Sequence, residues 1–273
     1  DSTADIAPER AKELGITVVP LTVLFGDEAY RDGIDLDGPA FYAKLTSSPV
    51  TPTTSAPSPG VFEEAYRQMV KDGATAVLAI SLGGSLSATY AAALNAAQRV
   101  SAETGVPFEV VDSHTVSGGF GLPAIIVAKE AQTGASLEQL KARAESLLSR
   151  VHLIASLDTL EYLQRGGRIG RARMLLGTLL NVKPLLEVRE GQVLPLENVR
   201  TRSKAQERVA QIVTKLGEIE AVAIVSSNDS VRDQFTGLVK TFWQGPIEQF
   251  TLGPVVGTHA GPGAGGIIAI TRE

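Results

Sequence analysis

Short apolar runs of strand length alternate with amphipathic segments of helix length along most of this chain of 273 residues. The runs are rich in β-branched residues, and the amphipathic segments repeat their apolar residues with the period of a helix. A helix between two strands carries the chain back, so that the second strand can lie parallel to the first. The alternation therefore predicts an α/β fold with a largely parallel sheet and flanking helices.

The predicted strands are bounded by turn residues and cover residues 15–25, 74–82, 107–113, 151–157, 182–188, 192–199, 219–227, 246–253 and 265–271. The predicted helices cover residues 61–73, 87–100, 136–151, 203–217 and 230–243. A further helix within 117–131 is apolar on all sides, which favours burial in the core. The wall of an apolar ligand channel is the alternative, because three glycines leave room at its start.

A basic, glycine-rich stretch at 165–173 interrupts this rhythm in the second half of the chain. The first half repeats strand, loop and helix as far as Arg150, so we expect two domains, residues 1–150 and 151–273. Both have ordinary domain size, and a cleft between two domains is a common ligand site.

The composition excludes several classes of function. The chain has no cysteine, which excludes disulfides, thiolate catalysis and sulfur-based zinc sites and makes the cytoplasm the expected location. A net charge of −5 gives no general attraction for nucleic acid or an anionic membrane. We find no apolar run of the roughly 18–20 residues that cross a bilayer. A soluble ligand or partner is therefore expected, without a metal or organic cofactor.

A Gly-Gly-Ser turn joins a predicted buried strand to an alanine-rich helix within residues 76–100. Free backbone N–H groups at a helix start favour an anion or carboxylate, and Ser85, Ser87 and Thr89 add hydroxyl donors. The alternative is that Ser85 only caps the helix.

The same turn is close to the nucleophile elbow G-x-S-x-G of hydrolases. A serine hydrolase on this chain would use Ser85, an acid such as Asp158 or Asp229, and His259. Ser87 stands where the elbow has its last glycine, and no HGGG-type oxyanion segment precedes the turn. The hydrolase is the second hypothesis.

Two basic segments, 165–173 and 199–205, would form one patch if the fold brings them together, and a solvated loop is the alternative for each. Interleaved aromatic residues are absent, which argues against RNA. The glycine-rich segment 258–266 lacks the lysine of a phosphate loop, which argues against an ATP-binding kinase subunit.

Eight segments in order along the chain carry a resemblance to one family: DSTAD at 1–5, TTSAPSP at 53–59, SLGGSLSATY at 81–90, VVDSHTVSGG at 110–119, LEYLQRGGRIG at 160–170, KPLL at 183–186, VRTRSKA at 199–205 and THAGPGAGG at 258–266. The chain resembles the DegV family of fatty-acid-binding proteins over nearly its whole length. Two segments depart from the usual pattern, since T-S-Q-P reads T-S-A-P here and L-S-G-T reads L-S-A-T. Both keep their hydroxyl groups.

The resemblance implies a two-domain α/β protein in which the second domain has a mixed sheet. It also implies a long-chain fatty acid in a tunnel between the domains, and a carrier without catalytic turnover. Such a carrier presents the carboxylate to a partner fatty acid kinase and delivers the acyl-phosphate to an acyltransferase. The family begins with a strand before its DSTAD segment, so we expect a short leading segment before Asp1.

Carried over by position, Thr54 and Ser55 match the hydroxyl pair that holds the carboxylate from one side, and Ser87 matches the serine on the other side. Arg168 and His259 match residues near the head group. Arg200 and Arg202 are the candidates for docking the partner.

The loop at 51–59 has three prolines and five hydroxyl residues. Proline restricts the loop, so its hydroxyls lose less freedom when a carboxylate binds. Neutral donors hold the head group without a permanent salt bridge, which phosphorylation would have to break.

Overall fold

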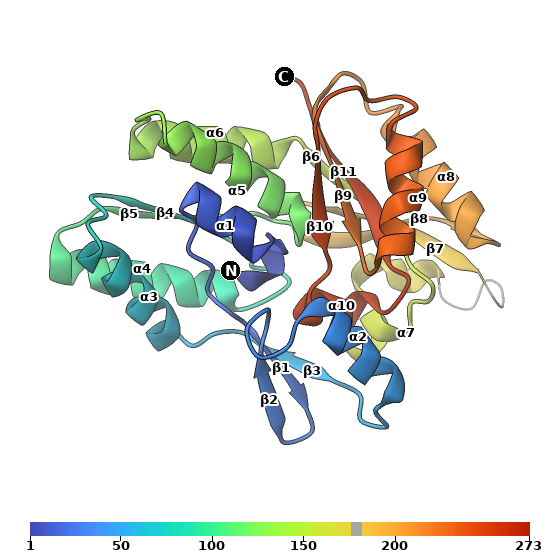
Figure 1. Cartoon of the computed structure of the whole chain (residues 1–273), viewed down its shortest axis with the longest axis horizontal. Coiled ribbons are helices and arrows are strands. Elements are labelled where there is room, and N and C mark those ends of the chain that lie inside the picture. The colour runs from blue at the N-terminus through green and yellow to red at the C-terminus, as the bar shows by residue number, and fades with distance from the viewer. Residues whose placement is uncertain (176–181) are drawn as a thin grey trace.

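The computed structural model describes residues 1–175 and 182–273 (Figure 1). Its largest sheet has six strands in the order β10-β9-β11-β6-β7-β8. These strands are β6 (Val151–Ser156), β7 (Lys183–Arg189), β8 (Gln192–Val199), β9 (Ile219–Ser226), β10 (Ile247–Thr251) and β11 (Gly265–Thr271). The pair β9–β10 is parallel and the other neighbours are antiparallel, so the sheet is mixed, as the family resemblance implied.

The two faces of this sheet have different neighbours, because successive side chains of a strand point to opposite faces. One face packs under α8 (Arg202–Val213) and α9 (Asp229–Val239), with Ile154, Leu185, Ile224 and Ile267 in the shared core. The other face carries Leu153, Leu186, Val188 and Val225, which share a core with α5 (Gly118–Ala131) and α6 (Leu137–Ser149). This inner face is turned toward the first half of the chain.

The first half contains a smaller layered unit around two parallel strands, β4 (Val77–Ser81) and β5 (Phe108–Asp112). Helix α4 (Thr89–Thr104) connects them, which is the predicted strand-helix-strand order. In Figure 1, α5 and α6 lie on one side of these strands, and α3 (Pro59–Lys71) and α4 lie on the other. The predicted helix at 117–131 is α5, and most of its residues are buried.

The first half also contains a second small sheet, which packs against a helix near the end of the chain. It has the antiparallel order β2-β1-β3, with β1 (Thr22–Phe25), β2 (Glu28–Arg31) and β3 (Thr53–Ser55). Helix α10 (Pro254–Ala260) packs against β1, β3 and α2 (Gly38–Ser47) (Figure 1). The remaining elements are α1 (Pro8–Leu14), α7 (Glu161–Arg165) and the 3₁₀ helices η1 (Ser2–Ala4) and η2 (Gly170–Leu175).

Three predictions about local structure were wrong. Residues 15–21 are not a strand, because Gly15 ends α1 in the left-handed conformation and these residues belong to no sheet within the part of the chain that the structure describes. Ser85 does not cap α4, which begins at Thr89 after Ala88 and has no side-chain cap. Residues 53–55 of the proline-rich loop form β3, which pairs with β1. None of the described helices is long and apolar enough to cross a membrane.

Candidate functional site

One cavity is lined by residues from both halves of the chain. Its apolar wall is the inner face of the six-stranded sheet, which contributes Leu153, Ala155, Leu186, Val188, Val193 and Val225. These residues share a face because the strand register places Leu153 beside Val188, Ala155 beside Leu186, and Val188 beside Val193. The wall suits a long apolar ligand, since it offers no hydrogen-bonding side chain of its own.

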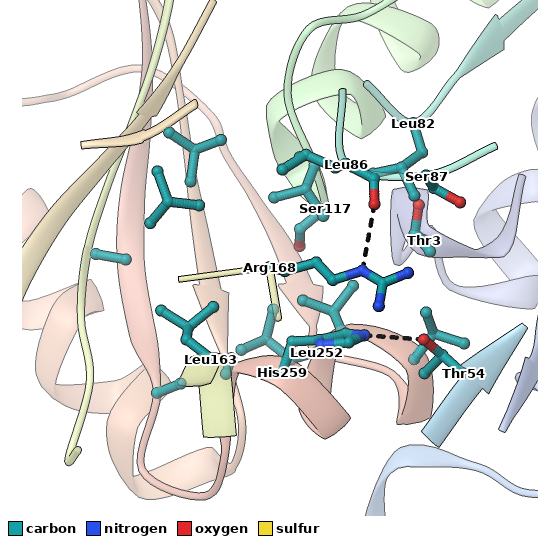
Figure 2. Close-up of a pocket in the computed structure, with 18 of the residues that line it drawn as sticks. Thr3, Thr54, Leu82, Leu86, Ser87, Ser117, Leu163, Arg168, Leu252 and His259 are labelled. Atoms are coloured by element: carbon teal, nitrogen blue, oxygen red, sulfur yellow. Dashed lines mark hydrogen bonds between the residues drawn. The ribbon is translucent and has the colours of Figure 1, made fainter. Parts of the chain in front are cut away.

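Polar side chains also line this cavity. Thr54, Ser55, Ser87, Arg168 and His259, the five residues predicted for the head-group region, all belong to its lining. Figure 2 shows the Arg168 guanidinium between the segment of Leu86 and Ser87 and the Thr54–His259 pair. The fold therefore brings together residues that are far apart in the sequence.

The Thr54–His259 pair connects two elements across the cavity wall. Thr54 lies on β3 and pairs in register with Val23 of β1, while His259 lies in the last turn of α10. The Thr54 Oγ1 and His259 Nε2 atoms are 2.9 Å apart, a hydrogen-bond distance (Figure 2). The neighbouring Ser55 is more exposed, and its hydroxyl donates to the Ala56 carbonyl at 3.3 Å.

Ser87 and Arg168 form the opposite side of the polar region. The Ser87 and Thr89 hydroxyl oxygens are 2.8 Å apart, and the Thr89 N–H donates to Ser87 Oγ at 3.3 Å. Arg168 donates from Nε to the Leu86 carbonyl at 3.4 Å and from a terminal nitrogen to the Gly166 carbonyl at 2.9 Å. The guanidinium thus lies beside the turn that carries Ser87.

His259 is neutral at physiological pH. Burial lowers the pKa of its ring to about 4, and the positive charge of Arg168 acts in the same direction. Its Nδ1 atom is buried and has no hydrogen-bond partner among the described residues. A Cβ at Gly166 would collide with that nitrogen, which explains the glycine at this position of the RGGRIG segment. The region therefore combines one cation with neutral hydrogen-bonding groups.

The geometry does not assemble the triad of the hydrolase hypothesis. The Ser85 hydroxyl donates to the Gly191 carbonyl at 2.6 Å, and Ser85 is not part of the cavity lining. His259 bonds Thr54 instead. Asp158 pairs with two basic side chains, and Asp229 pairs with a neighbouring arginine on its own helix. The hydrolase alternative has no support in these contacts.

The end of the first basic segment lies beside the strand that leads into the second one. Helix η2 packs along β8, and Asn198 Nδ2 donates to the Leu175 carbonyl at 3.4 Å. Arg200 is exposed just after β8. Arg202 is exposed but forms an ion pair with Asp158. Its Nε donates to Asp158 Oδ1 at 3.2 Å, and a second contact joins the same two side chains.

Sequence reasoning missed two hydroxyl residues of the lining, Thr3 and Ser117. Both lie within segments of the family resemblance, but neither was assigned a role. Their hydroxyls are already engaged, since Thr3 donates to Asp1 at 2.6 Å and Ser117 donates to Asp5. The apolar wall was also missed, although the alternation within each predicted strand carried that signal.

Comparisons with known proteins cover the whole chain. A DegV domain-containing protein of Deinococcus radiodurans is 38% identical over 276 residues, which cover 98% of this chain and 95% of that protein. One of Streptomyces coelicolor is 35% identical over 284 residues, which cover 100% of this chain and 97% of that protein.

Solved structures agree with this match. A DegV family protein from Thermus thermophilus, described by its fatty acid binding, has a TM-score of 0.90 and 33% identity, with 100% of this chain and 98% of that chain covered. DegV from Bacillus subtilis, described as a fatty acid binding protein, has a TM-score of 0.86 and 30% identity, with 100% and 97% covered. The predicted two-domain α/β fold is thereby confirmed.

The profile of the family described as "Uncharacterised protein, DegV family" matches residues 1–272. Together with the identities to its relatives and the shared fold, this match shows that the chain belongs to the DegV family.

Proposed function

We propose that this protein is a carrier that binds one long-chain fatty acid in the cavity between residues 1–150 and 151–273. The acyl chain lies against the sheet wall, and Thr54, Ser55 and Ser87 hold the carboxylate near Arg168 and His259. The observation that carries the proposal is one cavity lined by both an apolar sheet face and neutral hydroxyl groups. The fatty acid binding described for the two relatives supports it.

The apolar wall supplies most of the proposed affinity. Each buried methylene contributes about 0.8 kcal/mol, so about fifteen methylenes contribute on the order of 12 kcal/mol before ordering costs. The head-group residues therefore need only to orient the carboxylate. Hydroxyl donors suit this task because their hydrogen bonds are weaker than those of an ion pair.

We further propose that the bound carboxylate is phosphorylated by a partner kinase in the cytoplasm and that the acyl-phosphate passes to an acyltransferase. Arg200 and Arg202 would dock that partner. Their support is the packing of η2, which holds the end of the first basic segment, along β8, which leads into the second one. The protein itself contributes binding and orientation and has no turnover of its own.

Recovery of the ligand tests the binding proposal directly. Purified protein is denatured, extracted and analysed by mass spectrometry, and delipidated protein is then incubated with palmitate. We expect one long-chain fatty acid per chain. Absence of fatty acid in both experiments would contradict the proposal.

Two serines of one turn provide a matched pair of variants. Ser87→Ala removes a hydroxyl from the cavity lining, whereas Ser85→Ala removes one that is bonded to Gly191 outside it. The carrier proposal expects weaker palmitate binding in Ser87→Ala alone. Ester hydrolysis that is present in the wild type and lost in Ser85→Ala would support the hydrolase instead.

A further inference from the structure

Two buried carboxylates from the first half of the chain converge on the start of α10. Asp5 and Asp32 are 9% and 4% exposed. The Gly253 N–H donates to Asp5 Oδ1 at 2.9 Å, and the Val255 N–H donates to Asp32. Helix α10 has no side-chain cap of its own, so these acids accept hydrogen bonds at its beginning.

Gly253 permits this close approach. A Cβ at this position would lie 3.1 Å from Asp5 Oδ1 and 3.1 Å from Asp32 Oδ1. The φ of Gly253 is −73°, which any residue can adopt, so the glycine provides space rather than a special backbone conformation. Both carboxylates therefore pack directly against the residue that precedes the helix.

Each carboxylate is also fixed by a hydroxyl group. Ser117, which lines the cavity, donates to Asp5 Oδ2. Ser2 donates to Asp32 Oδ2 at 2.8 Å and accepts from the N–H of Leu21, another lining residue, at 3.0 Å. The two acids thus connect α10 to two further parts of the cavity wall.

The hydrogen bonds to both acids offset part of the free-energy cost of burying them. Burial raises the pKa of Asp32 to about 6 and holds the pKa of Asp5 well above its ordinary value. Neither acid forms an ion pair within residues 1–175 and 182–273, so hydrogen bonds alone compensate their burial. Because burying two carboxylates costs free energy, we expect them to have a role that apolar side chains would not have.

We propose that Asp5 and Asp32 are positioning residues of the head-group site, which hold α10 so that His259 stays within hydrogen-bond distance of Thr54. The inference rests on the proposed function. Helix α10 spans only seven residues, Pro254–Ala260, so a displaced beginning moves the His259 ring near its end. Arg168 and Ser87, on other segments, keep their places.

A double-mutant cycle on palmitate affinity tests this role. The delipidated variants are Asp32→Ala, His259→Ala and the double variant, and hexadecanol is the matched ligand without a carboxylate. We expect each single change to raise the palmitate Kd about tenfold, and the double change to raise it no further, because both act through one group. Independent effects would multiply to about a hundredfold.

Two further variants separate positioning from folding. Asp32→Asn keeps an acceptor oxygen for the Val255 N–H, so its palmitate Kd should stay within about twofold of the wild type. Gly253→Ala pushes both carboxylates away by a few tenths of an ångström. It should therefore weaken palmitate binding in a folded protein, with no further loss when it is combined with His259→Ala, even if Asp32→Ala does not fold. Hexadecanol binding should change less than about twofold throughout.

Multiplicative effects in the cycle, an unchanged palmitate Kd in both Asp32→Ala and Gly253→Ala, or equal weakening of hexadecanol would overturn the inference. These results would leave the proposed function standing, because the wild type would still bind palmitate. A wild type that binds no palmitate would overturn the proposed function first and the inference with it.

Discussion

Replacing Asp32 with asparagine should stabilise the protein at neutral pH, although it removes a buried, hydrogen-bonded carboxylate. Burial raises the pKa of Asp32 from its ordinary 3.8 to about 6, against hydrogen bonds from Ser2 and the Val255 N–H that lower it. Asp5 and Tyr42 are the titratable side chains nearby, and Asp32 acts on the pKa of both. Asparagine has nearly the same shape and carries no charge at any pH.

The direction in which stability changes with pH follows from proton binding to Asp32 in the native and unfolded states. A folded pKa above the unfolded value means that the native state binds the Asp32 proton more tightly, so wild-type stability falls as pH rises from about 4 through about 6. A rise from 3.8 to about 6 corresponds to about 3 kcal/mol, because a tenfold change in acidity is worth about 1.4 kcal/mol. In the unfolded chain Asp32 is already mostly deprotonated at pH 4, so the advantage of Asp32→Asn over the wild type should grow by about 2.4 kcal/mol between pH 4 and pH 7.

Thermal unfolding measured across this pH range tests the prediction. In a chain of this length, about 2.4 kcal/mol corresponds to about 5 °C in Tm, because each kcal/mol moves Tm by about 2 °C. The matched control is Asp35→Asn in the same loop. Hydrogen bonds from the Arg31 side chain and backbone lower the pKa of Asp35 to about 2, so the control should be less stable than the wild type by a nearly constant amount between pH 4.5 and 7.5.

A Tm difference between Asp32→Asn and the wild type that is the same at pH 4.5 and pH 7.5 would refute the reasoning. It would mean that the folded protein does not raise the pKa of Asp32. A rising difference in Asp35→Asn as well would point to a general effect of net charge instead.

Three other predictions concern ligand binding and partner docking. Ser87→Ala should weaken palmitate binding by about 1 kcal/mol, about fivefold in a titration, with Ser85→Ala unchanged. Gly166→Ala should displace the His259 ring, which a Cβ would strike, and weaken palmitate binding at least as much as His259→Ala does; equal binding to the wild type would contradict the contact. Arg200→Glu should leave palmitate binding unchanged and lower the rate of phosphorylation by a cognate kinase at least tenfold, since Arg200 is exposed and outside the cavity lining; an unchanged rate would remove Arg200 from the docking proposal.

Much of the fold was readable from local patterns. Strands β4 to β11 and helices α3, α4, α6, α8 and α9 lie within or close to their predicted ranges, because apolar periodicity and turn residues act over a few neighbouring residues. The prediction for 15–21 was wrong because an apolar run becomes a strand only when another strand pairs with it. Helix α10 was missed because seven residues with a glycine in the middle carry too little helical signal.

By itself, the sequence determined the α/β class, most of the elements and, through ordered motifs, the family and the hydroxyl residues of the candidate site. Tertiary structure alone decided which of these residues meet. Thr54 and His259 are 205 positions apart in the chain, and Asp5 and Gly253 are 248 apart. Contacts at such separations depend on how sheets and helices pack, which no local pattern encodes. The apolar wall, the bond between Ser85 and Gly191, and the buried acids at α10 became visible only in the folded chain for that reason.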